Sequence, residues 1–178
     1  GGRRIGLRGG RPRARRRRSR QRARDAVASL RYPPNGTRGF GPFIAQSRWG
    51  AQMPTYRKAV EDHLVCCLLS ETRGAFEAIE EICAVPGIDI IVPAQFDLST
   101  ALGVSGQFDH PDFVAAVGRV ERAALAAGLP LCGVAVSRAQ AEALFARGYR
   151  MIAGFDVLWL RAQAAEMRGW LAAPPATA

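Results

Sequence analysis

Apolar and polar positions repeat in a regular order along most of this chain. Short apolar runs bounded by turn residues predict four β-strands, near residues 64–69, 88–93, 130–136 and 150–153. After each run, apolar residues recur every three or four positions, which is the spacing of an amphipathic helix. A strand followed by a helix, repeated in this way, predicts an α/β fold with a parallel sheet. Four such units are half of an eightfold (β/α)8 barrel.

The first of these helices has two distinct faces. Its apolar stripe consists of Ala75, Phe76, Ile79, Ile82 and Cys83. Its other face carries three glutamates, which we expect to be solvated, namely Glu77, Glu80 and Glu81. A Pro-Gly pair at residues 86 and 87 predicts its end.

Two acids follow the first two predicted strands. Glu71 comes just after the first apolar run and Asp97 just after the second. The carboxyl ends of neighbouring parallel strands share one edge of a sheet, and chemistry is placed at that edge in α/β proteins. Two carboxylates that converge there favour a hard divalent cation, Mg²⁺ or Mn²⁺.

The length and composition of the chain limit the size of its hydrophobic core. The 178 residues are 48% hydrophobic, enough for one globular core but fewer than the roughly 250 residues of a complete barrel. The net charge of +10 is concentrated at one end, because residues 1–30 contain 12 arginines and a single acid. The remainder of the chain is almost neutral, so the high net charge of the whole chain indicates nothing about the body of the protein.

We divide the chain at residue 20, into a basic tail over 1–20 and an incomplete barrel domain over 21–178. The tail is almost entirely Gly, Arg and Pro, and we expect it to be disordered. It is interpreted as an arm that binds RNA or other phosphates, as an ordinary solvated tail, or as a segment outside the native reading frame, which we favour. Residues 21–31 have the apolar spacing of the end of a surface helix.

The remaining residue counts exclude several classes of site. Four cysteines at positions 66, 67, 83 and 132 lack the C-x-x-C spacing of a zinc site. We expect them to be free thiols in a cytoplasmic protein. No apolar run reaches the roughly 18 residues of a membrane span, so no membrane partner is expected.

Several motifs together resemble the HpcH/HpaI aldolase/citrate lyase family. They are RYPPNGTRGFGP from Arg31, Arg48-Trp49-Gly50, E-T-x-x-A-F-x-A-I-x-x-I from Glu71, PGID from Pro86, D-L-S-x-A-L-G from Asp97 and G-x-D at Gly154. The similarity extends from about Gln21 to Leu171, so it covers most of the chain.

The resemblance implies a fold and an activity. It implies the C-terminal half of a TIM barrel of the phosphoenolpyruvate/pyruvate type. Members are class II aldolases that cleave a 4-hydroxy-2-oxo acid to pyruvate and an aldehyde through a metal-stabilised enolate. The expected cofactor is Mg²⁺ or Mn²⁺, with Co²⁺ also suitable, and the expected assembly is a homo-oligomer, a hexamer by family.

The resemblance also assigns site residues. Glu71 and Asp97 match the two metal ligands, and the backbone N–H groups of Phe96 and Asp97 would point to the pyruvate carboxylate. Leu69 stands where many members have Gln, and residues 94–96, Ala-Gln-Phe, stand where many have Gly-Pro-Ala. The predicted substrate contacts are therefore Leu69, Phe96 and Asp97.

Two catalytic groups of the family have no match in this chain. His63 and His110 do not correspond to the general-base histidine, and no arginine in residues 3–24 follows a predicted strand, so none is assigned to pyruvate. We therefore expect a truncated aldolase of low activity. The alternatives are an Arg-rich nucleic-acid-binding arm on a degenerate barrel fragment, although nucleic acid is not the partner we expect, and a structural subunit that pairs with a separate N-terminal half.

Overall fold

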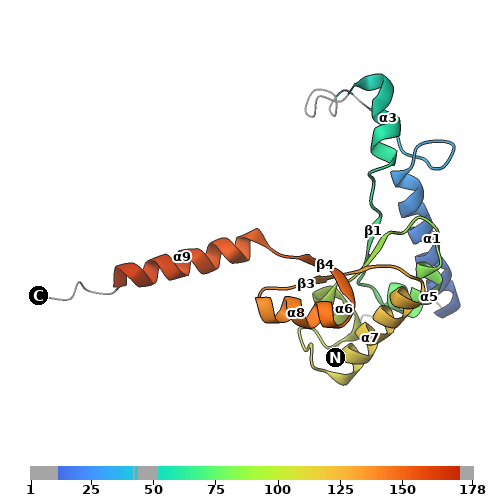
Figure 1. Ribbon diagram of the computed structural model, residues 1–178. Helices are drawn as coiled ribbons and strands as arrows, with labels where there is room; N and C mark the ends of the chain where they lie inside the picture. Colours follow the sequence, from blue (N-terminus) through green and yellow to red (C-terminus); the bar gives the residue numbers. More distant parts are fainter. Residues whose placement is uncertain (1–11, 42, 44–51, 173–178) are drawn as a thin grey trace, which may run out of the picture. The chain divides into compact units, whose positions relative to one another are not determined.

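The computed structural model describes residues 12–41, 43 and 52–172, in two compact units (Figure 1). The first unit ends at Leu131 and the second begins at Cys132. The motif Arg48-Trp49-Gly50 and residues 1–11 of the tail lie outside the described residues.

The strands confirm the predicted α/β pattern. In the first unit, β1 (Cys67–Ser70) pairs in parallel with β2 (Ile90–Pro93), in a register that runs from Cys67 opposite Ile90 to Ser70 opposite Pro93. Ile91 pairs in parallel with Leu131, the first residue of β3 (Leu131–Val134). With β4 (Tyr149–Ala153), the strand order is β1-β2-β3-β4.

Local capping groups start the helices of the first unit. The helix predicted after β1 is divided at Ala78 into α4 (Arg73–Glu77) and α5 (Ile79–Cys83). Thr72 Oγ1 accepts a hydrogen bond from the Ala75 N–H at 3.1 Å and so caps α4. His110 Nδ1 accepts one from the Asp112 N–H at 3.2 Å and caps α7 (Pro111–Ala126), which has proline at its first position.

The described part of the first unit contains two further helices. They are α3 (Met53–Glu61) and α6 (Gln95–Leu102), and α6 ends at Gly103 with a positive φ of 87°. A buried cluster joins α6 to α7 and consists of Leu98, Phe113, Ala116 and Val117. This cluster holds α6 directly after β2, at the sheet edge where the two acids were predicted.

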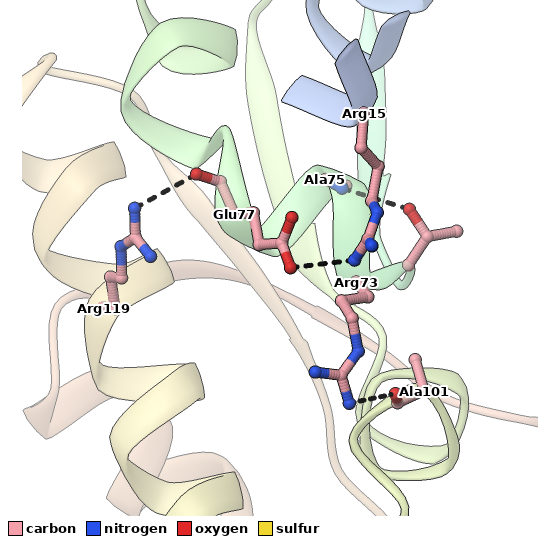
Figure 2. A network of polar contacts seen from close by, with 7 residues as sticks. Arg15, Arg73, Ala75, Glu77, Ala101 and Arg119 are labelled. Carbon is pink, nitrogen blue, oxygen red and sulfur yellow. Dashed lines mark hydrogen bonds and ion pairs between the residues drawn. The ribbon is translucent and has the colours of Figure 1, made fainter. Parts of the chain in front are cut away.

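Helix α1 (Pro12–Leu30) includes residues 12–20 of the tail, so the prediction of disorder was wrong for these residues. Arginine is a good helix former, and the carboxylates of α4 and α5 supply partners for this basic helix. Arg15 Nη1 lies 2.9 Å from Glu77 Oε1 (Figure 2), and Arg16 Nη1 lies 3.8 Å from Glu81 Oε1. The surface helix expected over 21–31 is the C-terminal part of α1.

The same contacts show that the glutamate face of α4 and α5 is not simply solvated. The Glu77 side chain is half-buried beside Arg15. Glu80 receives two hydrogen bonds from the guanidinium of Arg119, which also donates to the Glu77 carbonyl (Figure 2). The expectation of a solvated face was wrong for Glu77, whereas Glu80 and Glu81 remain partly exposed to solvent while they pair with Arg119 and Arg16.

The second unit contains most of β3, α8 (Arg138–Ala146), β4 and α9 (Asp156–Ala172). A Cβ at Gly133 would lie 2.8 Å from Leu144 Cδ1, so a side chain larger than hydrogen does not fit there without movement. Ser137 Oγ accepts a hydrogen bond from the Gln140 N–H at 3.3 Å and caps α8. Among the helices described, none has both the length and the apolar character needed to cross a bilayer.

Candidate functional site

The structure brings Glu71 and Asp97 to the carboxyl edge of the β1–β2 pair. Glu71 directly follows β1, and Asp97 lies in the first turn of α6, shortly after β2. The Ala94 N–H donates to the Ser70 carbonyl at 3.2 Å, which keeps the two strand ends side by side. Glu71 is half-buried and Asp97 is exposed.

Neither carboxylate is neutralised by the part of the chain that the structure describes. Within it, Glu71 and Asp97 form no hydrogen bond or ion pair through their side chains. The nearby Arg73 guanidinium instead donates to the Ala101 carbonyl at 3.2 Å, at the C-terminal end of α6 (Figure 2). As far as the described residues are concerned, both acids are therefore open to an added ligand.

The chemistry of this donor set fits a hard divalent cation. Two carboxylates at one sheet edge supply oxygen ligands, and the described residues include no cluster of three or more His, Cys, Asp or Glu that could hold a metal. Mg²⁺ is commonly held by one or two carboxylates, while water and substrate oxygens complete its coordination. Two acids are thus sufficient for a site that also takes an oxygen-rich substrate.

Two large apolar residues lie beside these acids. Leu69 is 56% exposed and Phe96 is 67% exposed. Leu69 is the third residue of β1, and Glu71 directly follows the strand. The Phe96 ring is fixed by an edge-to-face contact with Phe108, at 5.0 Å between centroids, and Phe108 contacts Phe113 at 5.4 Å.

The backbone next to Phe96 offers hydrogen-bond donors. Phe96 and Asp97 lie in the first turn of α6, where N–H groups have no acceptor within the helix. The partial positive charge of a helix N-terminus favours an anionic group there. This is the location in which the resemblance places the substrate carboxylate.

The two histidines have other positions. His63 precedes β1 in the chain, whereas Glu71 follows that strand. His110 caps α7, with its Nδ1 used as an acceptor. The structure therefore assigns neither to proton transfer beside Glu71.

A cavity of about 210 Å³ includes Glu71 and a residue that sequence reasoning did not assign. Arg22 of α1 lines it, together with Ser19 and Ala23. These three residues have the spacing i, i+3 and i+4, which places them on one helix face. The spacing is visible in the sequence, but the sequence does not show that this face of α1 and the residues of β1 line the same cavity.

A family model described as HpcH/HpaI aldolase/citrate lyase matches residues 18–162. The chain belongs to the HpcH/HpaI aldolase/citrate lyase family. The match begins close to the change in composition at residue 21, so most of the arginine-rich stretch falls outside it.

Curated relatives of this HpcH/HpaI chain include two aldolases. The 2-keto-3-deoxy-L-rhamnonate aldolase of Klebsiella pneumoniae is 35% identical over 83% of this chain and 55% of its own length. The hydroxypyruvate/pyruvate aldolase of Chromohalobacter salexigens is 35% identical over 82% of this chain and 58% of its own length. The chain spans about half the length of the curated relatives it matches.

Solved structures of the HpcH/HpaI family share the fold. A family member from Burkholderia cenocepacia superposes with a TM-score of 0.77 at 27% identity, over 86% of this chain and 62% of that one. An HpcH/HpaI aldolase from Desulfitobacterium hafniense gives a TM-score of 0.69 at 29% identity, over 84% of this chain and 59% of that one. These likenesses confirm the predicted α/β architecture.

Proposed function

We propose that this chain is part of a carbon–carbon lyase that cleaves a 4-hydroxy-2-oxo acid to pyruvate and an aldehyde. The observation that supports this most directly is the pair of carboxylates, Glu71 and Asp97, at one sheet edge of an HpcH/HpaI chain. The aldolase names of the matched relatives favour this function over the nucleic-acid-binding arm.

In this proposal, Glu71 and Asp97 hold Mg²⁺ or Mn²⁺, and Co²⁺ would also suit their oxygen ligands. Such a cation, when bound, supplies Lewis-acid stabilisation of the negative charge that develops on the 2-oxo acid. The N–H groups of Phe96 and Asp97 bind and orient the substrate carboxylate. Leu69 and Phe96 form an apolar wall that excludes water from the aldehyde portion.

Of the steps in the proposed reaction, proton transfer is the one for which this chain has the fewest suitable side chains. Neither histidine is placed to act as a general base, since His63 precedes β1 and His110 caps α7. A positioned base contributes about 10²–10⁴-fold to such reactions. We therefore propose that the 178-residue chain binds substrate and metal but turns over slowly.

Mn²⁺ binding, measured by electron paramagnetic resonance, tests the metal site without depending on turnover. Glu71→Gln and Asp97→Asn should each weaken Mn²⁺ binding by about tenfold or more. Asp62→Asn, an exposed acid that follows α3, is the matched control and should leave binding unchanged. Equal Mn²⁺ affinity in all four proteins would refute the assignment.

Pyruvate release from a 4-hydroxy-2-oxo acid, with Mg²⁺ or Mn²⁺ present, tests the activity itself. We expect a slow, metal-dependent rate that is lost in Glu71→Ala. Rapid cleavage that survives Glu71→Ala would contradict the proposed role of this residue.

We also propose that the chain assembles with copies of itself, by family as a hexamer, and works in the cytoplasm. Helix α9 supports assembly because it exposes large apolar side chains, namely Val157, Leu158, Trp159, Leu160, Met167 and Trp170. The four cysteines are free thiols, which suits a reducing compartment. Sedimentation velocity should show a concentration-dependent oligomer, and a monomer at every concentration would contradict this.

A further inference from the structure

The backbone carbonyl of Phe96 accepts hydrogen bonds from two side-chain hydroxyls. Ser99 Oγ donates to it at 2.8 Å and Thr100 Oγ1 donates to it at 2.9 Å. A hydroxyl within a helix often bonds to a carbonyl three or four residues earlier. Here two such bonds reach the same carbonyl, in the first turn of α6, so their effect is concentrated on one peptide group.

Each of these hydroxyls is itself held by a second hydrogen bond. The Ser99 side chain is completely buried, and its Oγ accepts a hydrogen bond from the Gly106 N–H at 3.0 Å. The hydroxyl oxygens of Thr100 and Ser105 lie 2.8 Å apart. The single hydroxyl proton of Thr100 is donated to the Phe96 carbonyl, so Ser105 is the donor in this second bond. Two short chains of hydrogen bonds therefore end at one carbonyl.

The Phe96 carbonyl and the Asp97 N–H belong to one planar peptide group. They point in opposite directions, so the groups that fix the carbonyl also fix the direction of the N–H. The Leu98 N–H donates to the Ala94 carbonyl at 2.9 Å and begins the hydrogen bonds of α6, which leaves the Asp97 N–H without an acceptor in the helix. Hydrogen bonds to the carbonyl polarise the peptide group and make its N–H a stronger donor.

Packing holds this segment in place. Leu98 is completely buried in the cluster that joins α6 to α7, and Val104 packs against the same cluster. The Val104 N–H also donates to the Ser99 carbonyl at 2.9 Å, which ties the loop after α6 to the helix. These contacts all lie within one described stretch of the first unit, residues 94–117. They fix the Asp97 N–H from within that stretch.

We propose that Ser99 and Thr100 are positioning residues for the substrate carboxylate. Their hydroxyls orient and polarise the peptide group between Phe96 and Asp97, and the Asp97 N–H binds the carboxylate of the 2-oxo acid. Neither side chain contacts the substrate, because both act through the backbone. The inference rests on the proposed lyase function and adds to it two side chains outside the metal site.

Thr100→Val is the main test, because this side chain is exposed and valine has nearly the same shape. In the full chain with Mg²⁺, it should weaken pyruvate binding about three- to fivefold, measured by calorimetry. Binding of methyl pyruvate, which has no carboxylate charge, should change less in an NMR titration. Thr100→Ser keeps the hydroxyl and should restore the affinity for pyruvate. Equal weakening for the two ligands, or no recovery with serine, would overturn the proposal.

Two controls separate this role from a general effect on the fold. Ser105→Ala removes the contact between Thr100 and the loop but keeps the bond to Phe96, so it should weaken pyruvate binding less than Thr100→Val does. Thr55→Val removes a hydroxyl that bonds to the Gln52 carbonyl in α3, and it should leave pyruvate binding unchanged. An effect of Ser105→Ala as large as that of Thr100→Val would assign Thr100 to the loop alone and overturn its role.

NMR tests the peptide group itself, without substrate or metal. The ¹³C resonance of the Phe96 carbonyl and the ¹⁵N resonance of the Asp97 amide should both move upfield in Thr100→Val and in Ser99→Ala, because each variant removes one hydrogen bond to the carbonyl. Ser99→Ala changes a buried residue, so circular dichroism must first show that it folds. Unchanged resonances in a folded Thr100→Val chain would overturn the proposal whatever happens to Ser99→Ala.

Failure of this inference differs from failure of the proposed lyase function. If Ser99 and Thr100 are positioning residues, Mn²⁺ binding at Glu71 and Asp97 stays unchanged in Thr100→Val while pyruvate binding weakens. Equal pyruvate affinity in the wild-type chain and in Thr100→Val would overturn the positioning role and leave the lyase proposal intact. A wild-type chain that binds neither Mn²⁺ nor pyruvate would overturn both proposals.

Discussion

At the scale of single residues, Arg119 connects α7 with α4 and α5. Its Nε and Nη2 lie 2.7 Å from the two carboxylate oxygens of Glu80, and its guanidinium stacks over the Phe76 ring at 5.0 Å. The hydrogen bonds from Arg119 lower the pKa of Glu80 from its usual value of 4.5. The pair therefore stabilises the folded state above pH 4.5, and that contribution is lost as the pH falls through the lowered pKa.

Arg119→Met tests this pH dependence. At neutral pH it should lower the free energy of unfolding by up to about 1 kcal/mol, and the loss should shrink as the pH falls below the usual pKa of 4.5 and Glu80 becomes protonated. Urea unfolding followed by circular dichroism measures both values. Arg122→Met changes an exposed arginine of the same helix and is the control, and an equal effect of both variants at both pH values would contradict the prediction.

The cysteines differ in burial, so we expect them to differ in reactivity. Burial raises the pKa of the Cys83 thiol to about 11, and burial, followed by the charge of Asp89, raises the pKa of Cys66. Cys67 is exposed on the opposite face of the chain, although partial burial also raises its pKa. A thiol reagent at neutral pH should modify Cys67 first and Cys83 only after unfolding. Mass spectrometry of the labelled peptides checks this order, and equal labelling of the two would refute it.

At the scale of elements, α1 depends on acids from other helices. Its arginines repel one another, and Glu77 supplies a partner to Arg15 at 2.9 Å. Glu77→Gln should therefore raise amide hydrogen exchange within residues 12–30 by about tenfold. Glu142→Gln removes one partner of an exposed pair within α8 and should leave α1 unaffected. Unchanged exchange in α1 of the Glu77 variant would show that other contacts hold this helix.

At the scale of the whole molecule, the two units differ in the size of their cores. Among the described residues of the second unit, few hydrophobic side chains are buried, namely Cys132, Ala135, Leu144 and Tyr149. Most of the buried hydrophobic residues described belong to the first unit, so we expect the second unit to open more readily in amide hydrogen exchange.

Gly133→Ala should expose this difference. Its Cβ would lie 2.8 Å from Leu144 Cδ1 and 3.0 Å from Tyr149 Cδ1, at a cost of about 1–3 kcal/mol. Exchange should rise in α8 and β4 but not in α7. Gly169→Ala, where nothing lies within 4 Å of the added Cβ, is the control in the same unit. A rise in α7 equal to that in α8 would contradict separate stabilities of the units.

Local patterns were sufficient to predict the strands and the position of the two acids. The apolar runs that form β1 and β2 can be recognised because turn residues bound them. The caps are local as well, since Ser137 and His110 accept hydrogen bonds from N–H groups three and two residues later. Glu71 and Asp97 could be assigned to one edge because strand direction in a parallel pair follows from chain order.

Only the tertiary structure decided which distant groups meet. Arg15 and Glu77 are 62 positions apart, so no local pattern could show that their contact holds α1 as a helix where disorder was predicted. The same docking places Arg22 in the lining of one cavity with Glu71 and the buried isoleucines. A short-range pattern in the sequence specifies secondary structure and chain direction, whereas partners of charged and apolar side chains depend on packing between elements far apart in the chain.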